Sequence, residues 1–179
     1  MIVVTCGENK PHMKKIFLIG SLILITHFSF GQYALQKGEA QFNAGVGFSS
    51  WGVPVFAGFD VGVHRDISLG GELSVRNYRD NYTNAKYKHN IIGISGNGNY
   101  HFNTLLEIPK DWDFYAGLNL GFYFWNSSND YPGNERSGVG LGAQVGGRYY
   151  FSEKFGLNLE FGGANTFSGG KFGVTFKLK

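Results

Sequence analysis

The side chains that could do chemistry in this chain are acids, cations and one histidine that recur at alternate positions of otherwise apolar segments. In a narrow interior without water such groups must pair, because an unpaired buried charge costs several kcal/mol. Arg148 can face Glu160 across a hairpin, and Arg76 can pair with Glu72 on its own segment. Two interpretations stay open: fixed salt bridges that fill the interior, or a proton relay or gated channel whose pairs exchange partners. The predicted network comprises Asp60, Glu72, Arg76, His101, Asp113, Arg148, Glu160 and Lys177.

The histidines show no catalytic or metal-binding pattern. His64 and His89 fall at the ends of alternating segments, and His101 falls on the polar face. No histidine lies beside a serine on the apolar face, as a lipid-modifying active site would need, and none has ligand spacing for a metal. The glycines at 138–142 alternate with apolar residues and no helix follows, so they form no phosphate loop. We therefore predict no enzyme activity, no catalytic residue, no metal and no cofactor.

The elements that must position these charges are eight segments in which apolar residues alternate with polar residues or glycine. A period of two is the signature of a β-strand. The segment 112–125 is the clearest case, since its even positions are apolar and its odd positions include Asp113 and Asn119. The predicted strands are Ala40–Ser49, Val53–His64, Ile67–Arg79, His89–Phe102, Trp112–Trp125, Gly138–Phe151, Phe155–Gly163 and Lys171–Lys179.

Eight such strands predict an all-β fold, an eight-stranded antiparallel up-and-down transmembrane β-barrel. Short turns near 63–66 and 151–154 alternate with longer polar loops near 80–88, 126–137 and 163–170, as in bacterial outer-membrane barrels. The short connection at 50–52 and the long one at 103–111 depart from that pattern.

Periodicity alone does not say which face looks inward, because a soluble lipocalin-like calyx would place the same apolar set inside. The asymmetry of the loops, the rim aromatics and the glycines on the polar face favour lipid outside. The aromatics predicted to form a girdle at the short-turn rim are Tyr100, Phe102, Trp112, Tyr149, Phe151, Phe155 and Phe176.

The first residues differ in kind from the rest. Lys14 and Lys15 precede an apolar run at 16–25 that is followed by small residues up to Gly31, which predicts a secretory signal peptide over 13–31. Residues 1–12 would then be a misassigned upstream start, and 32–179 the barrel. The only cysteine, Cys6, lies in this leader, and the remaining chain is nearly neutral, which predicts neither disulfides nor nucleic-acid binding.

The signal ending in Phe-Gly-Gln, a strand such as ISLGGELSVRNYR at 67–79 and the layout of eight strands resemble the small outer-membrane β-barrel family of Bacteroidetes, which is related in architecture to the OmpA and OmpX barrels. The resemblance covers 32–179 and implies localisation in the bacterial outer membrane. Such barrels often end in an aromatic residue read by the assembly machinery, whereas this chain ends FKLK, so Phe176 is the candidate for that role.

These observations predict a structural or surface-interaction role for a monomer with a plugged polar lumen. Its partners would be outer-membrane lipids, the outer-membrane assembly machinery and a possible surface ligand bound through loops 79–88 and 126–137, which combine Tyr, Asn, Ser and Gly. The alternatives are a transporter for small hydrophobic molecules, a lipid-modifying enzyme and a soluble lipocalin-like binding protein.

Overall fold

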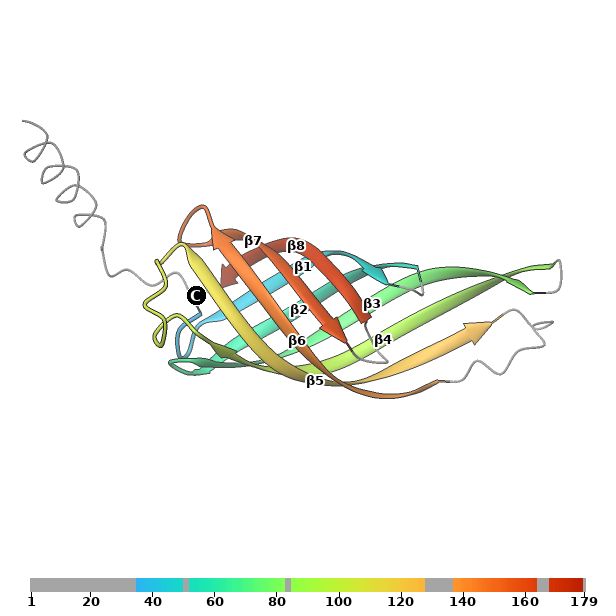
Figure 1. The fold of residues 1–179 in the computed structure, drawn as a ribbon, viewed down its shortest axis with the longest axis horizontal. Coiled ribbons are helices and arrows are strands. Elements are labelled where there is room, and N and C mark those ends of the chain that lie inside the picture. Colours follow the sequence, from blue (N-terminus) through green and yellow to red (C-terminus); the bar gives the residue numbers. More distant parts are fainter. Residues whose placement is uncertain (1–34, 50–51, 83–84, 128–136, 164–167, 179) are drawn as a thin grey trace, which may run out of the picture. The chain divides into compact units, whose positions relative to one another are not determined.

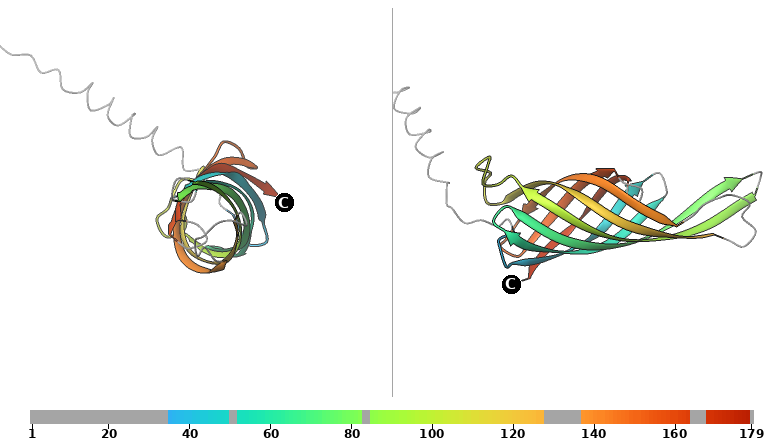
Figure 2. Two further views of the ribbon diagram at one scale, coloured as in Figure 1. Left: turned by 90° about the vertical axis from the view of Figure 1, so that its right-hand side faces the viewer. Right: turned by 90° about the horizontal axis from the view of Figure 1, so that it is seen from below.

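A computed structural model describes residues 35–49, 52–82, 85–127, 137–163 and 168–178. The predicted leader, 1–12 and 13–31, lies outside these residues. Eight antiparallel strands follow one another and close into a barrel, which Figure 2 shows as a ring when seen along its axis. The strands, labelled in Figure 1, are β1 (Ala40–Ser49), β2 (Val53–His64), β3 (Ile67–Tyr82), β4 (Ala85–His101), β5 (Trp112–Ser127), β6 (Gly138–Tyr150), β7 (Phe155–Gly163) and β8 (Ser168–Leu178).

The predicted fold class is confirmed, but the loop predicted at 79–88 is wrong, because β3 and β4 continue through most of it. Their pairing runs on from Arg79 opposite Lys88 to Tyr82 opposite Ala85. The composition of this hairpin resembles a loop, yet once two strands are in register each further pair adds backbone hydrogen bonds without a new closure cost. As a result β3, β4 and β5 extend well beyond the other strands at the loop end (Figure 1).

The bounds of the other strands differ from the predicted bounds by three residues or fewer. β4 and β6 each end one residue before their predicted ends, and β8 begins at Ser168 instead of Lys171. β5 extends to Ser127, so the predicted loop 126–137 begins inside a strand, and its residues 128–136 lie outside the described part of the chain.

The barrel closes where β1 pairs with β8 over its whole length. Gly45 and Gly173 lie directly opposite each other at this seam. A Cβ added to Gly45 would overlap the carbonyl oxygen of Phe172, and one added to Gly173 would overlap that of Ala44. Glycine is therefore needed at both positions because the two backbones approach closely on the narrow inner side of the wall.

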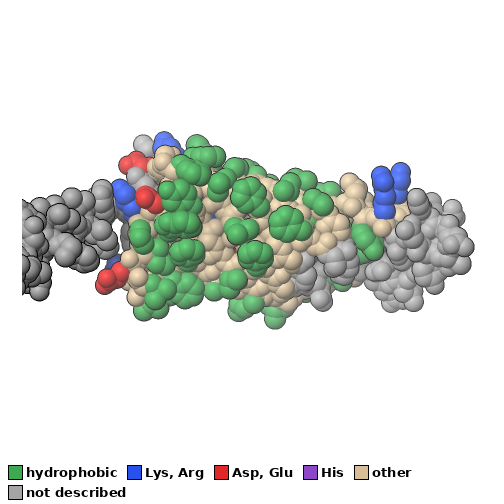
Figure 3. Space-filling model, turned by 45° about the horizontal axis from the view of Figure 1, so that its top comes forward, with side chains coloured by type: hydrophobic (Ala, Val, Ile, Leu, Met, Phe, Trp, Pro, Cys, Tyr) green, Lys and Arg blue, Asp and Glu red, His purple; other side chains and the backbone are tan. Residues whose placement is uncertain are grey.

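The two faces of the strands are sorted by polarity. Large apolar side chains such as Leu73, Leu118 and Leu141 are exposed on the outer wall. Figure 3 shows hydrophobic side chains gathered in a band over the face in view. The buried side chains are mostly polar or charged, which is the reverse of a soluble protein. This arrangement excludes the lipocalin-like alternative, whose calyx would be apolar inside. Within the described residues, no helix has the length and apolar character needed to cross a membrane.

Candidate functional site: the charged lumen

Arg148 is the centre of a group of charges near the short-turn end of the lumen. Its side chain, 2% exposed, comes from β6 and reaches Asp60 on β2 and Asp113 on β5. The Nη2–Oδ2 distance to Asp60 is 2.9 Å, and the Nη1–Oδ2 distance to Asp113 is 3.0 Å. The planar guanidinium, with donors pointing in several directions, can serve two carboxylates at once. Because β2 and β6 are opposite strands of the eight-membered ring, Arg148 ties together two opposite walls.

His101 extends this group toward β3. Its Nδ1 lies 2.7 Å from Asp113 Oδ1, and its Nε2 lies 2.9 Å from Ser68 Oγ. Because a carboxylate only accepts hydrogen bonds, Nδ1 carries a hydrogen. We call Asp60, Ser68, His101, Asp113 and Arg148 the turn-side cluster.

Ser68, His101 and Asp113 have the connectivity of a Ser-His-Asp catalytic triad. Sequence reasoning missed it, since it sought a Ser–His pair only on the outer face. The three side chains are between 0 and 2% exposed, however, and Asp113 is also engaged by Arg148. An acyl substrate must reach the serine oxygen and an oxyanion site beside it. Ser68 is fully buried and does not line the lumen cavity that Asp60, Glu72 and Arg148 border.

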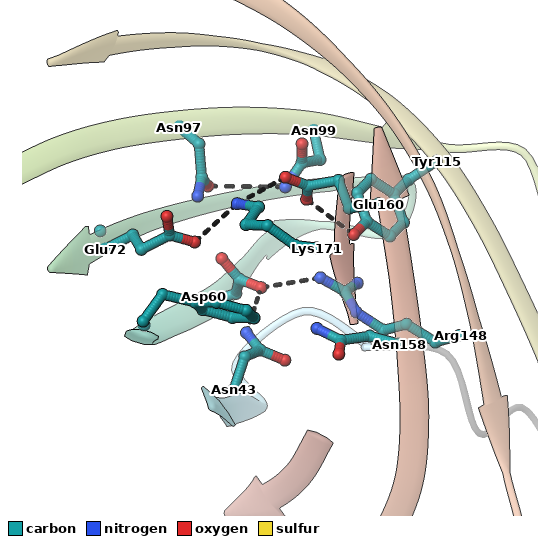
Figure 4. A pocket seen from close by; sticks show the side chains of 13 residues that line it. Asn43, Asp60, Glu72, Asn97, Asn99, Tyr115, Arg148, Asn158, Glu160 and Lys171 are labelled. Carbon is teal, nitrogen blue, oxygen red and sulfur yellow. Dashed lines mark hydrogen bonds and ion pairs between the residues drawn. The ribbon is translucent and has the colours of Figure 1, made fainter. Parts of the chain in front are cut away.

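A second group of charges surrounds Lys171 on β8. Its Nζ lies 2.7 Å from Glu72 Oε2 on β3 and 2.6 Å from Glu160 Oε1 on β7. The hydroxyl of Tyr115 on β5 donates to Glu160 Oε2 at 2.8 Å (Figure 4). We call these four residues the mid-lumen cluster. The guanidinium of Arg148 lies 4.2 Å from the centre of the Tyr115 ring, so the two clusters are in contact.

In each cluster one cationic side chain lies between two carboxylates. Arg148 serves Asp60 and Asp113 as Lys171 serves Glu72 and Glu160. In the dry interior two carboxylates this close repel each other strongly unless the cation lies between them. The cations therefore determine whether the lumen side chains can remain together.

Neutral polar side chains also form hydrogen bonds inside the lumen. Tyr150 donates to Gln41 Oε1 at 2.9 Å, and Thr175 donates to Asn43 Oδ1 at 2.8 Å. Asn43 and Gln41 both donate to Asp60. A cavity of about 20 Å³ lies between the side chains of the two clusters and has room for about one water molecule.

The structure places all eight predicted charges on the inner side of the wall but pairs them differently than predicted. The predicted Arg148–Glu160 pair is wrong, since Arg148 lies opposite Asn158 and binds Asp60 and Asp113 instead. Glu72 forms its ion pair with Lys171, and its interaction with the predicted partner Arg76 is a longer-range charge interaction.

Two of the predicted residues lie outside the clusters. Arg76 is buried toward the loop end and donates to Ser49 Oγ at 3.4 Å. Lys177 binds Glu39 at 2.7 Å near the short-turn end.

Sequence reasoning missed Lys171 and Tyr115, and the signal was available. Phe172, Val174 and Phe176 alternate outward, which places Lys171 on the inner face together with Lys177. Tyr115 shares the odd, inner positions of its strand with Asp113.

His89, which sequence reasoning placed at a strand end without a role, is buried inside the loop-end half of the wall. Its Nδ1 lies 2.9 Å from Ser127 Oγ. The indole N–H of Trp125 donates to the same His89 Nδ1 at 3.2 Å. Tyr78 stacks on its ring with a centroid distance of 5.9 Å. No group of three His, Cys, Asp or Glu side chains in the described ranges could hold a metal ion.

Most of the predicted rim aromatics lie in contact with one another near the short turns. Trp112 lies against Tyr149 with ring centroids 4.8 Å apart, Tyr149 contacts Phe151 at 5.1 Å, and Phe151 stacks on Phe155 at 6.2 Å. Tyr100 and Phe102 form a separate pair at 5.3 Å. Phe176 is opposite Phe155 in the β7–β8 ladder.

Solved structures with the same fold include several bacterial outer-membrane proteins. The outer membrane protein OprG of Pseudomonas aeruginosa aligns with a TM-score of 0.65 and 10% identity, over 83% of this chain and 99% of that one. The N-terminal barrel of OprF from the same organism aligns with a TM-score of 0.55 and 16% identity, over 79% of this chain and 98% of that one. Ail of Yersinia pestis, solved with the heparin analogue sucrose octasulfate, aligns with a TM-score of 0.54 and 11% identity, over 80% of this chain and 100% of that one.

Identities this low show a shared fold and nothing about shared ligands. No curated protein matches the sequence, and a Bacteroidetes origin stays a prediction. The family model for the outer membrane protein beta-barrel domain matches residues 20–178. Its match covers nearly the whole barrel, and the outer wall is apolar where lipid would contact it. The chain therefore belongs to the outer membrane protein β-barrel family and is a protein of the bacterial outer membrane.

Proposed function

We propose that this protein is a closed, non-conducting barrel that presents its long hairpins at the cell surface and has no catalytic step of its own. The observation that carries the proposal is the bridge from Arg148 on β6 to Asp60 on the opposite strand β2. A side chain that spans the lumen and is held at both ends blocks the path that water and ions would need.

The width of the barrel supports the same proposal. Eight strands enclose an interior that side chains can just fill. In this barrel the lumen side chains bond one another, and the cavity of about 20 Å³ between the clusters is too small for a continuous column of water. An ion would have to shed its hydration and break the cross-lumen pairs to pass.

The test is the conductance of the refolded barrel in a planar lipid bilayer. We expect no stepwise current above that of the protein-free bilayer, with insertion checked by the shift in gel mobility between heated and unheated samples. Arg65→Gln, which removes an exposed turn cation, is the matched control and should behave identically. Steady open steps from the folded wild-type barrel would contradict the closed lumen.

Transport of small hydrophobic molecules is a second candidate because the wall is uneven in height. The described β6–β7 pairing reaches only Ala143 opposite Gly163, whereas β5–β6 pairing continues to Gly138. The edge of β6 at 138–142 thus has no described β7 partner. A hydrophobic molecule that entered the loop end could leave sideways there without passing the charged clusters. Faster partition of a hydrophobic fluorophore into vesicles with the folded barrel than into protein-free vesicles would favour this candidate.

A further inference from the structure

The connection between β4 and β5, residues 102–111, is long although it lies at the short-turn end of the barrel. It carries two neighbouring leucines, Leu105 and Leu106, whose side chains are 65% and 64% exposed. The β2–β3 and β6–β7 turns at the same end expose charged side chains such as Arg65 and Lys154 instead. Adjacent exposed apolar side chains that continue an apolar band mark a contact with a membrane or with another protein.

Backbone hydrogen bonds fix the shape of this loop. The N–H of Leu106 donates to Phe102 O at 2.9 Å, and the N–H of Ile108 donates to Asn103 O at 3.1 Å. Glu107, between these two donors, has a φ of 50°, in the left-handed region that residues other than glycine rarely adopt. Because the backbone is held on both sides of Glu107, the two leucines stay exposed and do not fold back onto the barrel.

The loop leaves and re-enters the wall at two rim aromatics, Phe102 and Trp112. The N–H of Phe102 donates to Phe114 O at 2.8 Å, and Asn103 Nδ2 donates to Trp112 O at 2.5 Å. The rings of Trp112 and Phe114 stack with a centroid distance of 5.4 Å. Figure 1 shows the loop beyond the ends of the strands at the short-turn end. The leucines therefore continue the rim aromatics at the level where lipid headgroups meet acyl chains.

We propose that Leu105 and Leu106 insert into the phospholipid leaflet at the short-turn end and anchor this rim of the barrel to it. Lipid is the partner that fits, because the pair is continuous with aromatics at the edge of the lipid-facing wall. Short turns of outer-membrane barrels face the periplasm, so the leaflet is the periplasmic one. An amphipathic segment at such a boundary places its apolar side chains among the upper acyl chains. Glu107 is exposed and stays among the headgroups.

The test attaches a fluorophore to single cysteines in a Cys6→Ser chain, since Cys6 is the only cysteine of the sequence. Chains labelled at Leu105→Cys or at Leu106→Cys are refolded in phosphatidylcholine vesicles without bromine, with acyl chains brominated near the headgroup, or with acyl chains brominated near the bilayer centre. We expect bromine near the headgroup to quench either label at least about twofold, and central bromine to quench less, because interfacial apolar side chains reach about 5–10 Å into the boundary. Arg65→Cys, on an exposed turn at the same end, is the matched control and should be quenched by neither lipid.

A second comparison changes the neighbour of the label. Leu106→Gln in the chain labelled at Leu105→Cys should weaken the quenching at least about twofold, because a polar amide favours the aqueous side of the boundary. Glu107→Gln removes a charge but keeps Leu106, so it should leave the quenching unchanged. All the replaced side chains of this loop are exposed, so these variants should fold, and their heat-dependent gel mobility checks this.

Three outcomes would overturn the proposal. The two loop labels could be quenched no more than the label at Arg65→Cys, or Leu106→Gln could leave the quenching as it was. A loop label could also remain unquenched in vesicles of the purified barrel but become shielded from a water-soluble quencher in intact outer membranes. That result would show a periplasmic protein as the partner of the leucines in place of lipid.

Discussion

Replacing Arg148 with methionine should lower the free energy of unfolding by about 3–5 kcal/mol. The substitution keeps much of the side-chain volume but leaves Asp60 and Asp113 buried beside each other without their common cation. His101 can offset part of the charge on Asp113 but has no contact with Asp60 among the described hydrogen bonds. The measurement is reversible urea unfolding of the barrel in lipid vesicles, followed by tryptophan fluorescence and gel mobility.

Two further variants separate charge from packing. Arg65→Met removes an exposed arginine and should change the free energy of unfolding by no more than about 0.5 kcal/mol. Adding Asp60→Asn and Asp113→Asn to Arg148→Met removes the uncompensated charges and should recover a large part of the loss. If the triple variant is no more stable than the single one, packing rather than charge is what Arg148 supplies.

Replacing Lys171 with methionine should lower the free energy of unfolding by about 3 kcal/mol. The loss arises because Glu72 and Glu160, both held by the ammonium group, then face each other across the lumen. We place it at the lower end of the range because this pair of carboxylates is slightly more exposed than that around Arg148. The same urea titration measures it.

Lys154→Met, on an exposed turn, is the matched control and should leave the free energy of unfolding nearly unchanged. Adding Glu72→Gln to Lys171→Met leaves Glu160 with its hydrogen bond from Tyr115 and removes the repulsion. That double variant should be more stable than Lys171→Met alone. A Lys171→Met loss below about 1 kcal/mol would mean that the mid-lumen cluster does not hold the wall together.

The strands could be predicted from the sequence because a barrel wall has the same two environments along every strand. The bounds of β1, β2 and β7 match their predictions. The extension of β3 and β4 could not be predicted in this way. Its residues are polar on both faces once the wall leaves the membrane, so the alternation that marks a membrane strand is lost.

The inward positions could also be predicted, whereas the partners could not. Alternation places Arg148 and Glu160 inside, and sequence proximity then suggests that they pair. The actual partner Asp60 is 88 residues away from Arg148. The stagger and tilt of the strands in the closed barrel determine which side chains meet across the lumen. The alternation of residues along a single strand predicts neither of these quantities.

The most direct test of the cross-lumen bridge is the NMR signal of the Arg148 guanidinium in the barrel refolded in nanodiscs with ¹⁵N-labelled arginine. Held by Asp60 and Asp113, Arg148 should show separate Nη resonances that exchange slowly with water. Exposed Arg65 and Arg79 provide internal references and should show averaged, rapidly exchanging signals. Asp60→Asn together with Asp113→Asn should make the Arg148 signal resemble theirs. An Arg148 signal that is averaged and fast in the wild-type barrel would contradict a lumen closed by these ion pairs.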